Sequence, residues 1–227
     1  MRYSDLQLGD GSRESWGSAA NEFVDSVGDS DVFGVDWARQ QQAHLLALDH
    51  QEIELAESLV LLTATASTTY PSSSTSIPPV VHFEEGILSS MQACQRALSR
   101  ALSGVDWRAV RVYGVDDRGY LHRHTGVYVA DDSVDVSTFD RWISAHTNNS
   151  SLAEPEAHGD GAVRVDHEVE VDDGRSWVAG YLMANTPGCD TRSGRDHGLQ
   201  SAQNNVQRGA VVLDRVDEPA ISYGKPI

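Results

Sequence analysis

The segment from Val110 to Val129 constrains the fold of this chain more than any other part of the sequence. Two stretches rich in Val and Tyr flank Asp116-Asp117-Arg118-Gly119, a run of residues typical of a tight turn. This pattern predicts a β-hairpin with strands at about 108–115 and 120–129. The hairpin therefore commits part of the fold to an antiparallel sheet.

The sequence around the hairpin predicts helices and further strands. Leu88, Met91, Gln95, Leu98 and Leu102 recur at helical spacing, so we expect an amphipathic helix at roughly 83–103. The other expected elements are a helix over 36–59, a buried strand over 60–66, a short helix around 139–146 capped by Ser137, a helix around 177–182 and a strand over 209–213. Together they predict an α+β fold with a central, largely antiparallel sheet and helices packed on it.

Three regions are expected along the chain. Residues 1–34 are rich in Gly, Ser and Asp, with few large apolar groups, and are expected to be loosely ordered. Residues 35–186 hold the periodic elements and are expected to form one domain. Residues 187–227 are expected to be an irregular tail with one short strand.

The charge of the chain reflects an unusual choice of residues. The 227 residues carry a formal net charge of −17, and the 22 Asp and 12 Glu face 16 Arg and one Lys, Lys225. An acidic surface with Arg in place of Lys is typical of proteins from salt-loving archaea, where molar salt screens the repulsion between carboxylates. Phosphate binding normally uses Lys and Arg and weakens as salt rises. Any role on DNA must therefore depend on a focused site.

The sequence also indicates the compartment. Its start lacks the apolar core of a signal peptide, and no apolar run is long enough to span a membrane, so we expect a cytoplasmic protein. Cys94 and Cys189 are expected to be free thiols. No phosphate-binding Gly-x-x-x-x-Gly-Lys loop is present, so we expect no ATP-driven chemistry.

The hairpin contains the strongest candidate site. Side chains alternate along a strand, so His122 and His124 are expected to face the same side. Two imidazoles on one rigid face, next to the acidic turn, can form a metal site. The alternative is a chance His-x-His pair in a chain with nine His.

Three motifs occur in a fixed order: Leu62-Thr63-Ala64-Thr65-Ala66-Ser67 after a buried strand, His122-Arg123-His124, and Tyr181 on a helix. This ordered set resembles the rolling-circle replication initiators of the HUH endonuclease superfamily, particularly those of haloarchaeal plasmids and viruses. The resemblance covers about Val60 to Asn185. It implies an antiparallel sheet with helices against one face, and a metal-dependent nickase that cuts and rejoins single-stranded origin DNA.

The resemblance also implies roles for particular residues. His122, His124 and an acidic residue would bind Mn²⁺ or Mg²⁺, with Asp116 the first choice and Asp117 the second. Tyr181 would attack the DNA and form a 5′-phosphotyrosyl link. Thr63 and Thr65 would lie beneath the site as scaffold. Origin DNA and the host replication machinery are the implied partners.

Two features depart from the family pattern. Arg123 stands where the family usually has a bulky apolar residue, so it must reach out of the sheet, pair with an acid or contact a phosphate. No Lys and no second Tyr follow Tyr181 on its helix, which favours a one-tyrosine enzyme.

Other interpretations of the same residues stay open. Tyr181 could be a half-buried aromatic residue, and Asp116 an ordinary turn residue. The chain could be an inactive relative that binds DNA or a partner protein, a single-tyrosine transposase, or an unrelated acidic metal-binding enzyme. Three further histidines, His82, His158 and His167, are expected at the surface.

Overall fold

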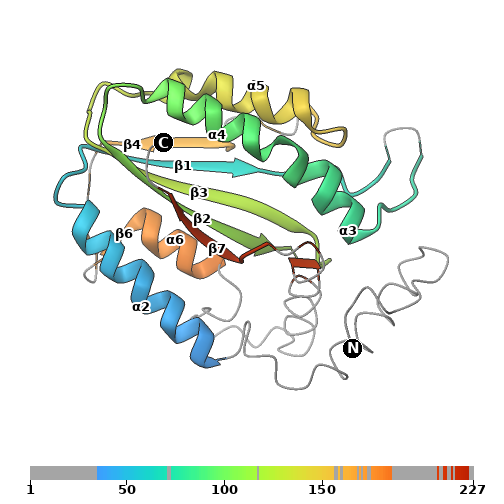
Figure 1. The fold of residues 1–227 in the computed structure, drawn as a ribbon, viewed down its shortest axis with the longest axis horizontal. Coiled ribbons are helices and arrows are strands. Elements are labelled where there is room, and N and C mark those ends of the chain that lie inside the picture. The colour runs from blue at the N-terminus through green and yellow to red at the C-terminus, as the bar shows by residue number, and fades with distance from the viewer. Residues whose placement is uncertain are drawn as a thin grey trace.

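The chain folds into a five-stranded antiparallel sheet with helices on both faces (Figure 1). The computed structural model describes residues 35–70, 73–116, 118–155, 158, 161–167, 169, 171–172, 175–185, 209, 212–213, 216 and 218–224. The strand order is β4-β1-β3-β2-β7, and every neighbouring pair is antiparallel. The predicted α+β class is confirmed.

The predicted hairpin forms the centre of the sheet. β2 (Trp107–Val115) and β3 (Leu121–Val129) pair along their whole length, within one residue of the predicted bounds. β1 (Ser58–Ala64) pairs with the other side of β3 and places Thr63 opposite His124. β4 (Val163–Asp166) and β7 (Ile221–Gly224) are the edge strands.

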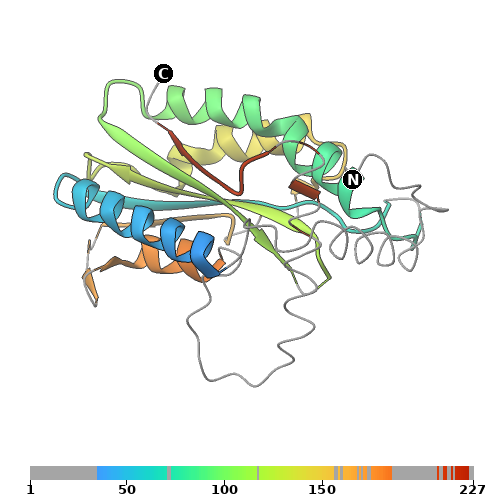
Figure 2. The same cartoon turned by 60° about the horizontal axis from the view of Figure 1, so that its bottom comes forward.

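Helices cover the two faces of the sheet in separate pairs, which Figure 2 shows as three layers. One face carries α4 (Ser89–Ala101) and α5 (Asp140–Asn149), with the π-helical turn η2 (His82–Leu88) leading into α4. The other face carries α2 (Val35–Glu52) and α6 (Trp177–Asn185). Short elements complete the fold: α3 (Pro79–Val81), η3 (Val136–Phe139), β5 (Val171–Asp172) and β6 (Arg175–Ser176).

The expectation that helices pack against one face only is wrong. Leu59 and Leu61 of β1 are buried in a core with α2 and α6, while Val60 and Leu62 are buried in a core with α4 and α5. A strand that is apolar at consecutive positions must be covered on both sides. The run Leu59-Val60-Leu61-Leu62 therefore requires the second helix layer.

Several predicted bounds differ from those observed. The first helix ends at Glu52 rather than residue 59, because Leu59 pairs in β1. Asp135, not Ser137, caps the short helix: its side chain accepts a hydrogen bond from the Thr138 N–H at 3.0 Å. A strand over 209–213 is wrong, since Gly209, Val212 and Leu213 are helical and the strand of the tail is β7. A short apolar run fits a buried helix as well as a strand.

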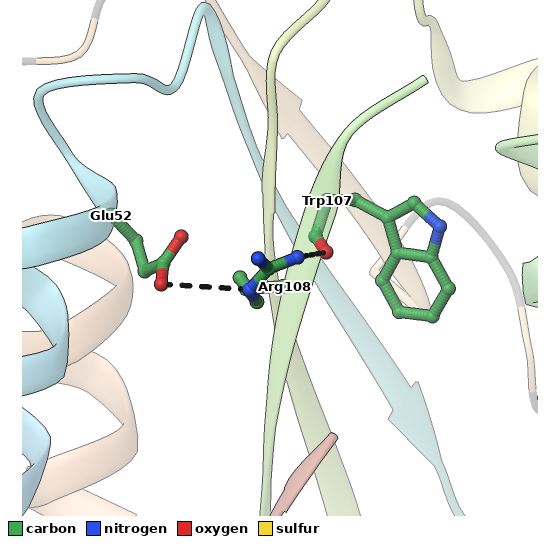
Figure 3. Close-up of polar contacts among 3 residues, drawn as sticks. All are labelled: Glu52, Trp107 and Arg108. Carbon is green, nitrogen blue, oxygen red and sulfur yellow. Dashed lines mark hydrogen bonds and ion pairs between the residues drawn. The ribbon is translucent and has the colours of Figure 1, made fainter. Parts of the chain in front are cut away.

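An ion pair at the end of α2 attaches this helix to the sheet (Figure 3). The carboxylate of Glu52 lies 3.7 Å from Nε of Arg108 on β2, and Arg108 also donates to the carbonyl of Trp107 at 2.9 Å. This contact joins the C-terminal end of α2 to the start of β2.

Residues 1–34, most of the tail, Cys189 and Asp117 lie outside the described residues. The boundaries of the three expected regions therefore stay predictions. Cys94 is buried and free, and its burial raises the pKa of the thiol to about 11. No helix within the described ranges has the length and hydrophobicity needed to cross a membrane.

Candidate functional site

His122 and His124 share the face of β3 that is covered by α6. The next residue on that face, Gly126, lies under α6 so closely that a Cβ there would meet a Val178 methyl group at 2.5 Å. The two imidazole rings are neighbours, with centroids 4.6 Å apart and planes at 81°. The predicted sharing of one face by the His pair is therefore confirmed.

Tyr181 reaches the His pair from α6. Its ring centroid lies 5.0 Å from that of His124, and the two rings meet edge to face at 89°. The Tyr181 side chain is 39% exposed, whereas His124 is 2% exposed. The tyrosine thus connects a buried histidine to the surface, and it does not point into the core.

Thr63 holds His124 from the neighbouring strand. Oγ1 of Thr63 lies 3.1 Å from Nδ1 of His124, across the register pair that joins β1 to β3. The other ring nitrogen, Nε2, is buried and has no hydrogen-bond partner among the described residues. Burial, with a smaller contribution from His122, lowers the pKa of His124 to about 3. The imidazole is therefore neutral near pH 7, with one nitrogen bonded and the other open.

His122 lies over a glycine of the opposite strand. Gly114 is its cross-strand partner, and a Cβ at Gly114 would lie 2.5 Å from Nε2 of His122. Residue 114 therefore has to be glycine for the imidazole to lie where it does. Burial lowers the pKa of His122, and the carboxylate of Asp116 opposes this shift.

Asp116 has a clear structural role in the hairpin turn. Its Oδ1 accepts hydrogen bonds from the backbone N–H of Arg118 at 2.9 Å and of Tyr120 at 2.8 Å. Within the described residues, no group of three or more His, Cys, Asp or Glu side chains is arranged to hold a metal ion. The structure brings the two histidines together but does not complete a three-ligand set with Asp116.

Neither Thr65 nor Arg123 makes a described hydrogen bond or ring contact with the His pair. Thr65 follows β1, and its backbone N–H and carbonyl lie 3.4 Å from Nε2 of His158 and 2.8 Å from Nε2 of His146. The Arg123 side chain lies on the opposite face of the sheet, with its guanidinium carbon 5.9 Å from the Tyr113 ring centroid. No described carboxylate lies within ion-pair distance of Arg123.

Two of the histidines expected at the surface are buried. His82 is 2% exposed and His158 5% exposed, while His167 is exposed as predicted. Thr65, one of the two ring partners of His158, is 93 residues away, so no local pattern marks the burial of this histidine. Nδ1 of His82 is buried without a partner among the described residues, and its Nε2 lies 3.2 Å from the carbonyl of Ala66.

A cation and an aromatic ring stack at the edge of the same face. The guanidinium carbon of Arg164 on β4 lies 4.0 Å from the ring centroid of Trp177, the first residue of α6. The Arg164 side chain is 58% exposed and also pairs with Asp166 at 3.2 Å. Neither Arg164 nor Trp177 stands out in the sequence, because the contact joins two elements that are apart in the chain.

Comparison with known proteins identifies the family. Residues 44–181 match the family described as "Putative rep protein (DUF1424)", which covers more than half of the chain. The chain belongs to this family. The matched range includes Thr63, both histidines of the pair and Tyr181 at its end.

One curated relative comes from a haloarchaeon. It is the "Uncharacterized 36 kDa protein" of Halobacterium salinarum, which is 37% identical over 81 residues. That stretch is 36% of this chain and 25% of the relative, so the chain spans about a quarter of the relative's length. No solved structure gives a significant match to the chain.

Proposed function

We propose that this chain is a rolling-circle replication initiator that nicks and rejoins single-stranded origin DNA with Tyr181 as the nucleophile. Membership in the Rep family supports a replication role. The observation that carries the chemistry is the arrangement around His124, which contacts Thr63 on one side and the exposed Tyr181 on the other. This arrangement supports the resemblance to HUH endonucleases that the ordered motifs indicate.

His122 and His124 fit as two ligands of a divalent cation, Mn²⁺ or Mg²⁺. With the Nδ1 proton of His124 donated to Thr63, its buried Nε2 presents a lone pair to the site. We propose Asp116 as the third ligand, because its charge acts on His122. The described residues hold no three-ligand group, so the Asp116 carboxylate would have to turn toward the histidines when a cation binds. A bound cation would supply Lewis-acid stabilisation of charge on the scissile phosphate.

The proposed reaction is a transesterification at phosphorus. The phenolic oxygen of Tyr181 forms a bond to the phosphorus, and the bond from phosphorus to the 3′ oxygen breaks. The phenol loses its proton to solvent, and the departing 3′ oxygen takes up a proton. The products are a 5′-phosphotyrosyl link and a free 3′-hydroxyl that can prime synthesis. Because the link conserves one phosphodiester-type bond, rejoining needs no ATP.

The stacked pair of Arg164 and Trp177 is our proposed contact for the DNA strand. Single strands bind proteins through base stacking on aromatic or guanidinium planes, with charge on the backbone. This pair lies beside the helix of Tyr181, on the same face of the sheet. A stacking contact suits a chain whose net charge of −17 opposes general phosphate binding.

The test is capture of the covalent adduct. Labelled single-stranded DNA carrying the origin of the encoding replicon is incubated with the protein in molar KCl with Mn²⁺ or Mg²⁺, and the products are separated on a denaturing gel. We expect an adduct with the parent protein, none with Tyr181→Phe, and none when a chelator is present. Tyr70→Phe is the matched control, because Tyr70 is similarly exposed at 37% and lies in a loop away from the site.

The outcomes separate the enzyme from its alternatives. An adduct that persists in Tyr181→Phe but not in another tyrosine variant would move the nucleophile elsewhere. Origin binding with no adduct from the parent protein would overturn the nickase and leave an inactive DNA-binding relative.

A further inference from the structure

Asp49 of α2 is a buried carboxylate that lies between the helix of Tyr181 and the strand of the His pair. The residue is 1% exposed, and no described Arg, Lys or His side chain forms an ion pair with it. A carboxylate buried without a cation is costly unless hydrogen bonds satisfy its oxygens. If Asp49 only filled space in the core, an apolar residue of similar size would stabilise the fold as well or better. The hydrogen bonds that Asp49 makes therefore need an explanation.

Three short hydrogen bonds satisfy Asp49. Oδ1 accepts from the Tyr128 hydroxyl at 2.7 Å and from Oγ of Ser176 at 2.6 Å, and Oδ2 accepts from the Ser176 N–H at 2.7 Å. Hydrogen bonds to a charged acceptor are short and about twice as strong as neutral ones. Burial and the charge of Asp49 raise the pKa of Tyr128, so its hydroxyl stays a donor.

The bonds to Ser176 fix the start of α6. Ser176 directly precedes the helix, and its Oγ accepts a hydrogen bond from the Ala179 N–H at 3.1 Å, as an N-cap residue does. Asp49 thus holds both the backbone and the side chain of the capping residue. Tyr181 lies just after the first turn of that helix, so a shift of the cap moves the tyrosine ring.

The bond to Tyr128 fixes the other side of the site. Tyr128 lies on β3, on the same face as His124 and four residues further along the strand. The cross-strand partner of Tyr128 is Arg108, which pairs with Glu52 one turn after Asp49 (Figure 3). Two carboxylates of α2 therefore hold two adjacent positions of the sheet, which makes α2 a fixed support for α6.

We infer that Asp49 is a positioning residue for the nucleophile, which sets α6 against β3 and thereby places the Tyr181 ring against His124. This inference rests on the proposed function of Tyr181. A displacement of about 1 Å at a reacting group can lower a rate by about 10²-fold. Loss of the Asp49 contacts should therefore act on the chemical step more than on DNA binding.

Two variants and one control test the inference kinetically. Asp49→Asn removes the charge that holds Ser176 and Tyr128, and Tyr128→Phe removes one of its three bonds. We expect the maximal rate of adduct formation to fall about 30-fold in Asp49→Asn and about threefold in Tyr128→Phe, with the half-saturating DNA concentration changed by less than about twofold. Leu98→Ala is the control. Leu98 is a buried residue of α4, so its truncation destabilises the core between the sheet and α4 without a direct effect on α6.

A second readout needs no DNA. The edge-to-face contact places the His124 ring protons in the ring current of Tyr181, and Tyr181→Leu gives the shift of these protons without that ring. We expect the His124 ring resonances of Asp49→Asn to move toward the values of Tyr181→Leu, and those of Leu98→Ala to stay at the parent values.

The two readouts separate this inference from the proposed function. If the parent protein forms no adduct, the proposed function fails, and the His124 resonances still report whether Asp49 places the ring. If Asp49→Asn leaves these resonances unmoved, or loses no more activity than Leu98→Ala at equal thermal stability, Asp49 is an ordinary core residue and the inference is overturned.

Discussion

The two faces of the sheet each contain a pair of histidines, and the pairs differ in how their ring nitrogens are bonded. His122 and His124 lie under α6, and Nε2 of His124 has no partner among the described residues. His146 of α5 and His158 lie on the side of the sheet that α4 and α5 cover, with ring centroids 4.7 Å apart. Burial lowers the pKa of a histidine in both places, to about 3 for His124 and about 4 for His146.

The second pair is fully engaged with the chain around it. His146 contacts Oγ of Ser90 at 2.7 Å and the Thr65 carbonyl at 2.8 Å, and His158 lies 2.9 Å from the carbonyl of Glu154 and 3.4 Å from the Thr65 N–H. These bonds fix the chain as it leaves β1. Burial and a lowered pKa are therefore common to both pairs. The difference is that the pair beside the exposed Tyr181 has a ring nitrogen without a partner among the described residues.

Alanine at His124 and at His146 should separate the two pairs most sharply. His124→Ala is expected to lower adduct formation by at least about 10³-fold, because one of the two proposed histidine ligands of the cation is lost. His146→Ala should lower the free energy of unfolding by about 3 kcal/mol, from a buried ring and two hydrogen bonds. Adduct gels and urea unfolding, both in molar KCl, measure the two effects.

Each variant serves as the control for the other. The activity of His146→Ala per folded molecule should stay within about threefold of the parent, since its ring lies on the opposite face from Tyr181. If His146→Ala loses the adduct without losing stability, the chemistry depends on the face under α4 and α5, and the proposed difference between the two pairs is refuted.

The hairpin and the ordered motifs could be predicted because their signals are local. Asp116 and Gly119 mark the turn by their own chemistry, and strand alternation then puts His122 and His124 on one face. The resemblance to the HUH endonucleases places Thr63 next to the His pair, and Thr63 contacts His124. These parts of the site need only short-range rules and one family pattern.

The supporting network could not be predicted because its contacts join distant parts of the chain. In the sequence, Asp49 looks like any polar residue on the exposed face of a helix. Its partners Tyr128 and Ser176 are 79 and 127 residues away. His146 has the same character, since its partners Ser90 and Thr65 are 56 and 81 residues away. No pattern within a single element shows that such side chains are buried.

Acidification should destabilise the fold through His146. Its pKa is about 6.5 in the unfolded chain and about 4 in the fold, where burial acts first and the charges of His158 and Arg123 add to it. A lowered histidine pKa means that the stabilisation is complete above pH 6.5 and is lost as the pH falls toward 4. The loss approaches about 3 kcal/mol.

Unfolding of the parent and of His146→Leu between pH 7 and 4.5 isolates this contribution. Other buried histidines titrate in both proteins, so the difference between the two slopes belongs to residue 146. Equal slopes would show that the imidazole of His146 keeps the same pKa in the folded and unfolded chain.

Gly114→Ala should disturb His122 and His124, the open pair, which has an unpartnered ring nitrogen. It should leave His146 and His158, the closed pair, intact. The new Cβ would overlap Nε2 of His122 and push the imidazole away from its neighbour. We expect adduct formation to fall about tenfold, because a misplaced group loses part of its effect on the reaction. Gly161→Ala is the control, since no heavy atom lies within 4 Å of its Cβ. A tenfold loss in both variants would point to a general effect of alanine.

Arg164→Ala should have the smallest effect, a weakening of single-stranded DNA binding by about two- to fivefold. The matched control is Arg96→Ala, an exposed arginine of α4 on the face that carries the closed pair. Fluorescence anisotropy at 1 M and 3 M KCl measures the dissociation constants of both variants. A stacking contact depends less on salt than a phosphate contact does, since ions screen charge and leave ring contact unchanged. The dissociation constant of Arg164→Ala divided by that of the parent should therefore stay the same at 3 M KCl. A ratio that falls to one at 3 M KCl would show that Arg164 acts only as a screened charge and does not stack on the DNA.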